Sequence, residues 1–469
     1  MDRKTKKLFK NTWLFFLGNI GSKFIQFLLV PLYTYSLTTS EYGITDLIFT
    51  TINFLIPIFS IQITDSLLRF GLDKSVSKDE VINSALRVAF YSSVISVTLS
   101  PILLFYKVIA DYFILFVIIL NLRIYRDIFS VVLKIQDKNK LYAIDSIIYT
   151  FVLCIASYIF LVILKMGIIG YLLSFVVSNV FSIIFIIASS KLKIRNCKNN
   201  ELLKKMISYS LPLIFNSISY WIIMASDRYM IDFMLSKEDV GLYGIATKIP
   251  TIITTFTSIF GQAWLISSIS IYEDHEDTKY YSSAFKKYCA FSFILSSLLI
   301  LIVKPFMHVY VSDNYYDAWR FVPLLIVSAI YSGLCTFLNS IYYAFKNNRI
   351  PTITTLVGAI INIILNVILI RNIGVMGAVI ATLISWFVIS FAKIVKIKDV
   401  IKYSFEKSKF YISSIIIVIE CMIELLVKNN VFLYIINIIL VITLIIINRE
   451  IITDIVKTIR TMLFNKKVS

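Results

Sequence analysis

The chain has 469 residues, of which 58% are apolar and 16% charged, and its mean hydropathy is +0.83. A soluble protein of this length has about a quarter of its residues charged, and an outer-membrane barrel has short alternating segments. Here the apolar residues come in blocks of about twenty, enough for a helix to cross about 30 Å of hydrocarbon. The composition therefore predicts an all-α integral membrane protein and excludes the other two classes.

The apolar blocks predict about fourteen transmembrane helices. In chain order they are 11–36, 42–68, 82–106, 110–133, 141–164, 168–190, 207–235, 240–270, 284–305, 318–345, 350–370, 374–395, 410–427 and 431–448. The first block follows basic residues but is too long for the core of a signal peptide, so it is expected to be a retained helix.

The net charge of +18 is distributed in a way that indicates membrane topology rather than nucleic-acid binding. The N-terminus and every second connection carry 36 of the 46 Lys and Arg residues, and the other seven connections carry seven. By the positive-inside rule, this asymmetry predicts a multi-pass protein of the cytoplasmic membrane with both termini in the cytoplasm. Three cations remain, and they lie inside predicted spans: Lys23, Arg228 and Lys248.

Two short patterns recur at the same ordinal positions in two sets of six spans. Leu37 and Gly43 follow the first span as Leu235 and Gly241 follow the seventh, in the sequences LTTSEYG and LSKEDVG. A GxxG sequence also precedes both the sixth and the twelfth span, at Gly167 and Gly374. Because six is even, both sets begin on the same face, which predicts a parallel repeat whose pseudo-twofold axis runs along the membrane normal.

The repeat predicts the domain organisation. Its parts are an N-terminal six-helix bundle (1–190), a cytoplasmic linker (191–206), a C-terminal six-helix bundle (207–395), a cytoplasmic loop (396–409), two additional helices (410–448) and a basic cytoplasmic tail (449–469). Two such bundles around a central cavity are typical of a transporter that works by alternating access.

Other signals point to no further chemistry. The five cysteines form no CxxC pair, so no disulfide framework is expected. The acidic run Glu273–Asp277 is expected to be a solvated turn and not a metal site. The absence of a Walker motif indicates that ATP does not power the chain directly.

Three stretches resemble one known family. They are FLGNIGSKFIQFLLVPLYTYSLTTSEYGITDL at 16–47, YSLPLIFNSISYWIIMASDRYMI at 209–231 with the following 240–250, and FGQAW at 260–264. These stretches resemble the polysaccharide flippases (O-antigen and capsule, Wzx-type) of the multidrug/oligosaccharidyl-lipid/polysaccharide (MOP) exporter superfamily. With the span count, the resemblance covers nearly the whole chain, but its motifs identify the family better than the cargo.

The resemblance implies a transporter and not an enzyme. Its cargo would be a polyprenyl-pyrophosphate-linked oligosaccharide, moved from the cytoplasmic to the outer leaflet for surface polysaccharide biosynthesis. The implied partners are this lipid-linked oligosaccharide, membrane lipids, a polysaccharide polymerase and a chain-length regulator, without nucleic acid. The family fold has a cationic cavity that opens to one side at a time. No cofactor is implied beyond coupling to H⁺ or Na⁺.

The cations inside the spans suit an anionic cargo. A charged side chain at mid-bilayer costs about 3 kcal/mol, so it normally faces a cavity or a partner. Lys23, Arg228 and Lys248 are therefore the candidate cavity residues that hold the pyrophosphate, because Arg binds phosphate oxygens bidentately and Lys supplies a point charge. For Arg228 a structural ion pair with Asp227 or Asp232 is an equal alternative.

The acids inside spans offer candidates for ion coupling. Asp46 and Asp227 are the two selected, since an H⁺- or Na⁺-coupled exporter needs a carboxylate in its pathway. Asp65 and Arg69, four residues apart, are expected either to form a structural pair or to receive the incoming diphosphate. Glu420 and Glu424 share a face of an added helix and are interpreted as structural.

Three other functions remain open at this point. A multidrug exporter of the same superfamily is disfavoured because its cavity should be acidic. A membrane glycosyltransferase, polymerase or ligase is disfavoured because the longest predicted outer loop, about 306–317, carries little beyond His308 and Asp313. A flippase for the peptidoglycan precursor would face the same physical task, so composition does not distinguish it, and it stays an alternative.

Overall fold

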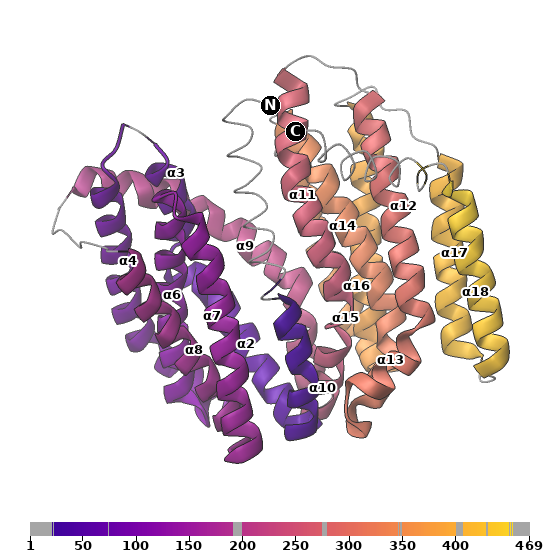
Figure 1. The fold of residues 1–469 in the computed structure, drawn as a ribbon, viewed down its shortest axis with the longest axis horizontal. Coiled ribbons are helices and arrows are strands. Elements are labelled where there is room, and N and C mark those ends of the chain that lie inside the picture. Colours follow the sequence, from indigo (N-terminus) through magenta and orange to yellow (C-terminus); the bar gives the residue numbers. More distant parts are fainter. Residues whose placement is uncertain are drawn as a thin grey trace, which may run out of the picture. The chain divides into compact units, whose positions relative to one another are not determined.

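The computed structural model describes residues 21–453 apart from 22, 74, 191–198, 274–278, 346, 348, 400–406, 428–429, 450 and 452. The regular elements of this described part are helices. The chain forms two compact units, and the first unit ends at Gly244 (Figure 1).

The first unit consists of helices that pack on one another along most of their length. They are a helix through residues 23–36, α2 (Thr39–Phe59), α3 (Ile63–Gly71), α4 (Lys78–Leu99) with its 3₁₀ extension η1 (Ser100–Phe105), α5 (Lys107–Ala110), α6 (Phe113–Ile135), α7 (Asn139–Ser157) with its π-helical extension η2 (Tyr158–Ile163), α8 (Gly167–Ser190), α9 (Asn200–Met234) and α10 (Lys237–Ala246). The helix α6 contacts α3, α4 and α8, and α9 lies against α2, α3 and α4.

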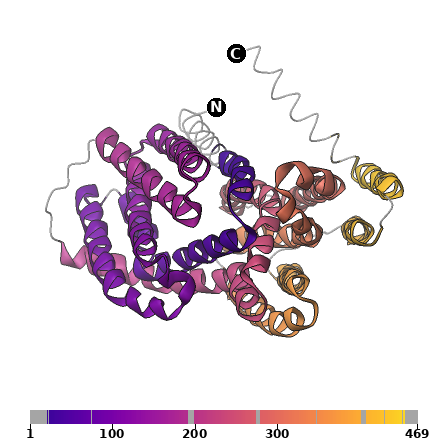
Figure 2. The ribbon, with the colours of Figure 1, turned by 90° about the horizontal axis from the view of Figure 1, so that it is seen from below.

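The second unit is built around one buried helix. Its elements are α11 (Pro250–Glu273), α12 (Lys279–Leu301), α13 (Val303–Tyr310), η3 (Asp313–Phe321), α14 (Val322–Ala344), α15 (Arg349–Ile373), α16 (Val375–Lys396), η4 (Ile397–Asp399), α17 (Lys407–Leu426) and α18 (Asn430–Ile447). The central helix α14 packs against α11, α12 and α16. At the edge of this unit α17 and α18 form a hairpin that packs on α12, as the end-on view shows (Figure 2).

The helical membrane class is confirmed, whereas the count of fourteen spans stays a prediction. Among the described residues, eight helices are long and apolar enough to cross a membrane, or nine if the bent helix α9 is one span. The bend is 51° between Asn200–Phe215 and Tyr220–Met234, and it follows Pro212, which cannot donate a hydrogen bond to the preceding turn. The first part of the span predicted at 11–36, residues 11–20, lies outside the described residues.

Two predicted spans are wrong as continuous helices. The span 42–68 is broken after α2, because Ile61 and Gln62 have left-handed backbone conformations with φ of 52° and 51°. The span 240–270 is broken by a turn at 247–249 between α10 and α11. Apolar composition continues through both breaks, so hydropathy alone does not reveal them.

The repeated glycines occupy matching structural positions. Gly167 and Gly374 have φ of 56° and 62°, a conformation that glycine adopts at no steric cost. Gly43 and Gly241 contact each other reciprocally. A Cβ on Gly43 would lie 2.0 Å from the carbonyl oxygen of Lys237, and one on Gly241 would lie 2.0 Å from that of Thr39. The same offset of 198 residues relates the two glycines and the two carbonyls, so this contact has local twofold character.

The two compact units do not follow the predicted boundaries. The division after Gly244 assigns α9 and most of α10 to the first unit, whereas the sequence predicts a boundary at the linker 191–206. The packing of α9 on α2, α3 and α4 accounts for this assignment. The arrangement as two six-helix bundles stays a prediction.

Candidate functional site

The candidate site begins on α2, whose start is fixed by a capping box. The hydroxyl of Thr38 accepts a hydrogen bond from the backbone N–H of Glu41 at 3.2 Å, and the Glu41 carboxylate accepts one from the backbone N–H of Thr38 at 2.8 Å. These bonds satisfy two backbone donors that the helix start would leave unpaired. Asp46 lies further along α2, next to Gly244 of α10. A Cβ added to Gly244 would lie 3.1 Å from the Asp46 carboxylate.

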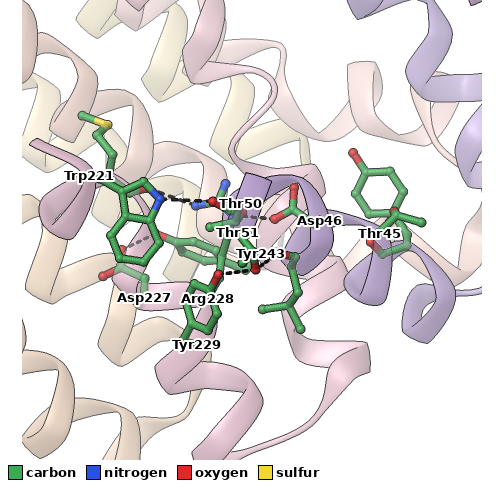
Figure 3. Close-up of polar contacts among 12 residues, drawn as sticks. Thr45, Asp46, Thr50, Thr51, Trp221, Asp227, Arg228, Tyr229 and Tyr243 are labelled. Carbon is green, nitrogen blue, oxygen red and sulfur yellow. Dashed lines mark hydrogen bonds and ion pairs between the residues drawn. The ribbon is translucent and has the colours of Figure 1, made fainter. Parts of the chain in front are cut away.

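Arg228 of α9 forms an ion pair with Asp46 of α2. The guanidinium Nε donates to the carboxylate, and Nη1 donates to the backbone carbonyl of Met224 at 3.1 Å (Figure 3). The two side chains are only 12% and 11% exposed. Breaking a buried pair by removing one partner typically costs about 3–5 kcal/mol, because the remaining charge stays uncompensated. This pair therefore joins α2 and α9 strongly.

The pairing of Arg228 with Asp227 or Asp232, weighed on sequence, is not the one observed. Asp227 accepts a hydrogen bond from the hydroxyl of Tyr243 at 2.6 Å, which occupies one of its carboxylate oxygens. Asp232 accepts one from Tyr106 at 2.6 Å and lies 3.4 Å from Lys237. Each acid thus has a hydrogen-bond partner from outside α9, as Arg228 has its ion-pair partner Asp46 on α2.

Aromatic and hydroxyl groups surround the ion pair. The hydroxyls of Thr51 and Tyr229 are 2.6 Å apart, and the indole N–H of Trp221 donates to the carbonyl of Thr50 at 3.2 Å (Figure 3). The ring of Tyr243 lies 5.5 Å from the Arg228 guanidinium carbon, within the range of a cation–π interaction. These contacts tie α2 to α9 over two turns around the charges.

The other two candidate cations have different surroundings. Lys23 is exposed on the helix through 23–36 of the first unit. Lys248 belongs to the second unit and is half-buried at the turn between α10 and α11, where its carbonyl accepts a hydrogen bond from the hydroxyl of Thr251. Its position at a helix break and not in a helix is a correction to the predicted span.

Asp65 and Arg69, expected either to form a structural pair or to receive the incoming diphosphate, both lie on α3. Within the described residues no ion pair joins them, and both side chains are exposed. The break at Ile61 makes α3 begin at Ile63, so Asp65 lies in the first turn and accepts a hydrogen bond from the Gln62 side chain at 3.0 Å. The carboxylate is therefore engaged at the start of the helix, and Arg69 one turn on does not reach it.

Sequence reasoning missed a second buried ion pair, in the first unit. Arg126 of α6 lies 3.6 Å from the carboxylate of Asp145 of α7, and its Nε donates to Ser182 of α8 at 2.9 Å. Ser182 donates in turn to Asp145 at 2.6 Å, and the guanidinium stacks 3.7 Å above the ring of Tyr149. Arg126 lies inside the predicted span 110–133 and within α6, which ends at Ile135. The sequence feature that could have indicated this pair is Asp145, a carboxylate inside the apolar span 141–164.

No metal site is indicated. Among the described residues there is no cluster of three or more His, Cys, Asp or Glu side chains with suitable positions. The acidic run considered on sequence, Glu273–Asp277, lies outside the described residues except for the helical position of Glu273.

Comparisons with known proteins agree with the membrane fold. The family described as "Polysaccharide biosynthesis protein" matches residues 8–266, and the family described as "Lipid II flippase MurJ" matches residues 326–446. A curated relative, "Lsg locus putative protein 1" of Haemophilus influenzae, is 23% identical over 75% of this chain and 88% of its own length.

Solved transporters have the same fold. The lipid II flippase MurJ in an inward closed conformation superposes with a TM-score of 0.70 at 17% identity, covering 96% of this chain and 99% of that one. An inward-facing multidrug resistance MATE family transporter of the MOP superfamily gives a TM-score of 0.66 at 13% identity, covering 82% and 94%. The first of the family matches spans more than half of the chain. The chain therefore belongs to the polysaccharide biosynthesis protein family.

Proposed function

We propose that this chain is a flippase for polyprenyl-pyrophosphate-linked oligosaccharide units, which it moves from the cytoplasmic to the outer leaflet by alternating access. The observation that carries the proposal is the Asp46–Arg228 pair, a nearly buried guanidinium inside an apolar helix of a polysaccharide biosynthesis transporter. Such a cation is costly in a membrane and is retained where it has an anion to bind.

The pair suggests how an anionic cargo is held and released. A pyrophosphate offers Arg228 a charge of the same sign as Asp46, but of larger magnitude and with more oxygen atoms, so it competes with Asp46 for the guanidinium. A coupling ion that neutralises Asp46 removes that competitor and frees Arg228 for the cargo. Asp46 is the better supported of the two candidate coupling residues, because its carboxylate forms the ion pair with Arg228, whereas Asp227 accepts a hydrogen bond from Tyr243.

Lys23 and Lys248 complete the proposed set of cargo-binding cations. The side chain of Lys23 is exposed, and no residue that the structure describes forms an ion pair with it. Lys248 lies at a helix break and is half-buried. Arg69 stays proposed as a group that meets the incoming diphosphate, since its side chain is exposed and not paired with Asp65.

The alternatives differ from the proposal in the charge of the site. A multidrug exporter for cationic compounds needs acids without cationic partners, and here Asp46 has one. A flippase for the peptidoglycan precursor would use the same cations, and the likeness to the lipid II flippase keeps it as the second candidate. We further propose the cytoplasmic membrane as the location, both termini in the cytoplasm, and a polysaccharide polymerase and chain-length regulator as partners.

The two lysines provide a test in cells whose surface polysaccharide depends on this chain. Lys23→Ala and Lys248→Ala are each expected to lower surface glycan about tenfold or more, equivalent to about 1.4 kcal/mol of lost cargo binding. Lys23→Arg should restore export in part, because it keeps the charge. Arg371→Ala, at an exposed position at the end of α15, is the matched control and should export normally.

Surface glycan and protein level are both measured. Normal export by both lysine variants would show that these cations do not bind the cargo. Failure of the variants to accumulate would mean that the lysines are structural.

A further inference from the structure

The hairpin of α17 and α18 buries two carboxylates that the proposed transport mechanism does not use. Glu420 and Glu424 of α17 are both 0% exposed. They lie one helical turn apart on the face that packs against α12 and α18. Two buried acids on one helix face of a membrane protein are costly unless they are paired, protonated or bound to a cation.

Glu424 has partners on two neighbouring elements. The ammonium of Lys304, at the start of α13, lies 3.5 Å from its Oε1 and donates to its backbone carbonyl at 2.9 Å. The amide of Asn437 in α18 donates to its Oε2 at 2.8 Å. Glu424 is therefore compensated as an anion, and its role in holding α13, α17 and α18 together is structural.

Glu420 has no such compensation. Neither of its carboxylate oxygens has a hydrogen-bond partner among the described residues, and no cation pairs with it there. Ser297 of α12 lies beside it, and the buried hydroxyl of Ser297 likewise has no hydrogen-bond partner of normal geometry among the described residues. A buried carboxyl on α17 and a buried hydroxyl on α12 thus occur in the same helix interface.

We infer that Glu420 is a reversible proton-binding site within the α12–α17–α18 interface of the second unit. A protonated carboxyl has one O–H donor and keeps an acceptor, so it can bond to a serine hydroxyl at little cost. An ionised carboxylate at the same place would face no positive charge and would lose its hydration. The neutral form therefore suits the observed packing, and loss of the proton loosens α17 from α12.

A route for the proton is built from neighbouring groups. Glu424 lies one helical turn from Glu420 and forms an ion pair with Lys304. Because the side chain of Lys304 is 14% exposed, this pair connects the interior with the surface. Among the described residues, the titratable groups that interact with Glu420 or Glu424 are Cys421 of the same helix, Lys304 of α13, Tyr316 of η3 and Tyr434 of α18, and the two glutamates interact with each other. Lys304 is the cation of this set and is engaged by Glu424, which leaves Glu420 to be neutralised by a proton. This inference does not depend on which cargo the chain carries.

The test is carbodiimide labelling of the purified full-length protein in detergent. Dicyclohexylcarbodiimide reacts with protonated carboxyl groups in apolar surroundings, and the labelled residue is identified by peptide mass spectrometry. Glu420 is expected to be labelled at about pH 6, and its labelling should fall about tenfold per pH unit once the proton is lost. Glu420→Gln should remove this label, whereas Glu201→Gln, at an exposed position in α9, should not.

Thermal unfolding provides a second readout. Glu420→Gln keeps the shape of the neutral side chain, so its unfolding midpoint should exceed that of the wild type at about pH 9 and match it at about pH 6. Labelling that does not change with pH, together with equal midpoints throughout, would overturn a reversible site. Protection from labelling by sodium but not potassium at constant pH would also overturn it, in favour of a sodium site.

Discussion

Replacing Arg228 by Ala is expected to abolish glycan export and to lower the free energy of unfolding by about 3–5 kcal/mol. The loss of stability follows because Asp46 would remain 11% exposed without its cation. The loss of export follows because the guanidinium is proposed to receive the diphosphate. A single variant does not separate the two effects, so the pair is best tested by neutralising both members.

The double variant Asp46→Asn/Arg228→Gln should recover most of the stability and still not export. Removing both charges leaves no uncompensated ion, and side chains of similar size keep the packing of α2 on α9. If the pair were only structural, this variant would both accumulate and export. Surface glycan and the unfolding midpoint of the purified protein are the two measurements.

The Arg126–Asp145 pair is the matched control. It is also buried, joins two helices of the first unit and lies in a network with Ser182. Arg126→Ala should destabilise the protein by a similar amount, whereas Arg126→Gln/Asp145→Asn should recover both stability and export. Loss of export in this double variant would show that neutralising any buried pair impairs transport.

Substituting Ala for Gly43 or Gly241 is expected to destabilise the first unit by about 1–3 kcal/mol or more. Each new Cβ would lie 2.0 Å from a backbone carbonyl oxygen. A backbone atom cannot relieve such a clash by changing rotamer, as a side chain can. The N-terminal turns of α2 and α10 would have to separate.

Because one separation relieves both clashes, the double variant should cost less than the sum of the two single variants. The control is Gly261→Ala in α11, where the new Cβ meets only a methyl group of Thr336 at 3.1 Å. Unfolding midpoints measure all four variants. Wild-type midpoints for Gly43→Ala and Gly241→Ala would contradict the close contact.

Local sequence signals predicted much of the fold. Apolar blocks located the helices, and the recurring glycines identified turns whose structures match, as at Gly167 and Gly374. The breaks at Ile61 and after Ala246 were missed because apolar residues continue through them. Hydropathy reports the environment of a segment and not the continuity of its hydrogen bonds.

The candidate site was predicted only in part, because its key contact is not local. Asp46 and Arg228 were both selected as functional candidates, but 182 residues separate them, and spacing on one helix cannot indicate that they pair. Spacing instead suggested a pair between Asp65 and Arg69, whereas the observed partner of the Asp65 carboxylate is the Gln62 side chain. Glu420 was interpreted as structural because its lack of partners becomes visible only when α12 and α17 are packed together.

The central proposal is tested most directly by translocation in proteoliposomes. The purified chain is reconstituted with a fluorescent polyprenyl-pyrophosphate-linked oligosaccharide, and a membrane-impermeant quencher reports how fast the glycan changes leaflet. The wild type is expected to accelerate translocation over protein-free liposomes, and Asp46→Asn/Arg228→Gln is expected to match the protein-free rate. Translocation by the wild type no faster than in protein-free liposomes, or equal translocation by the double variant and the wild type, would contradict the account.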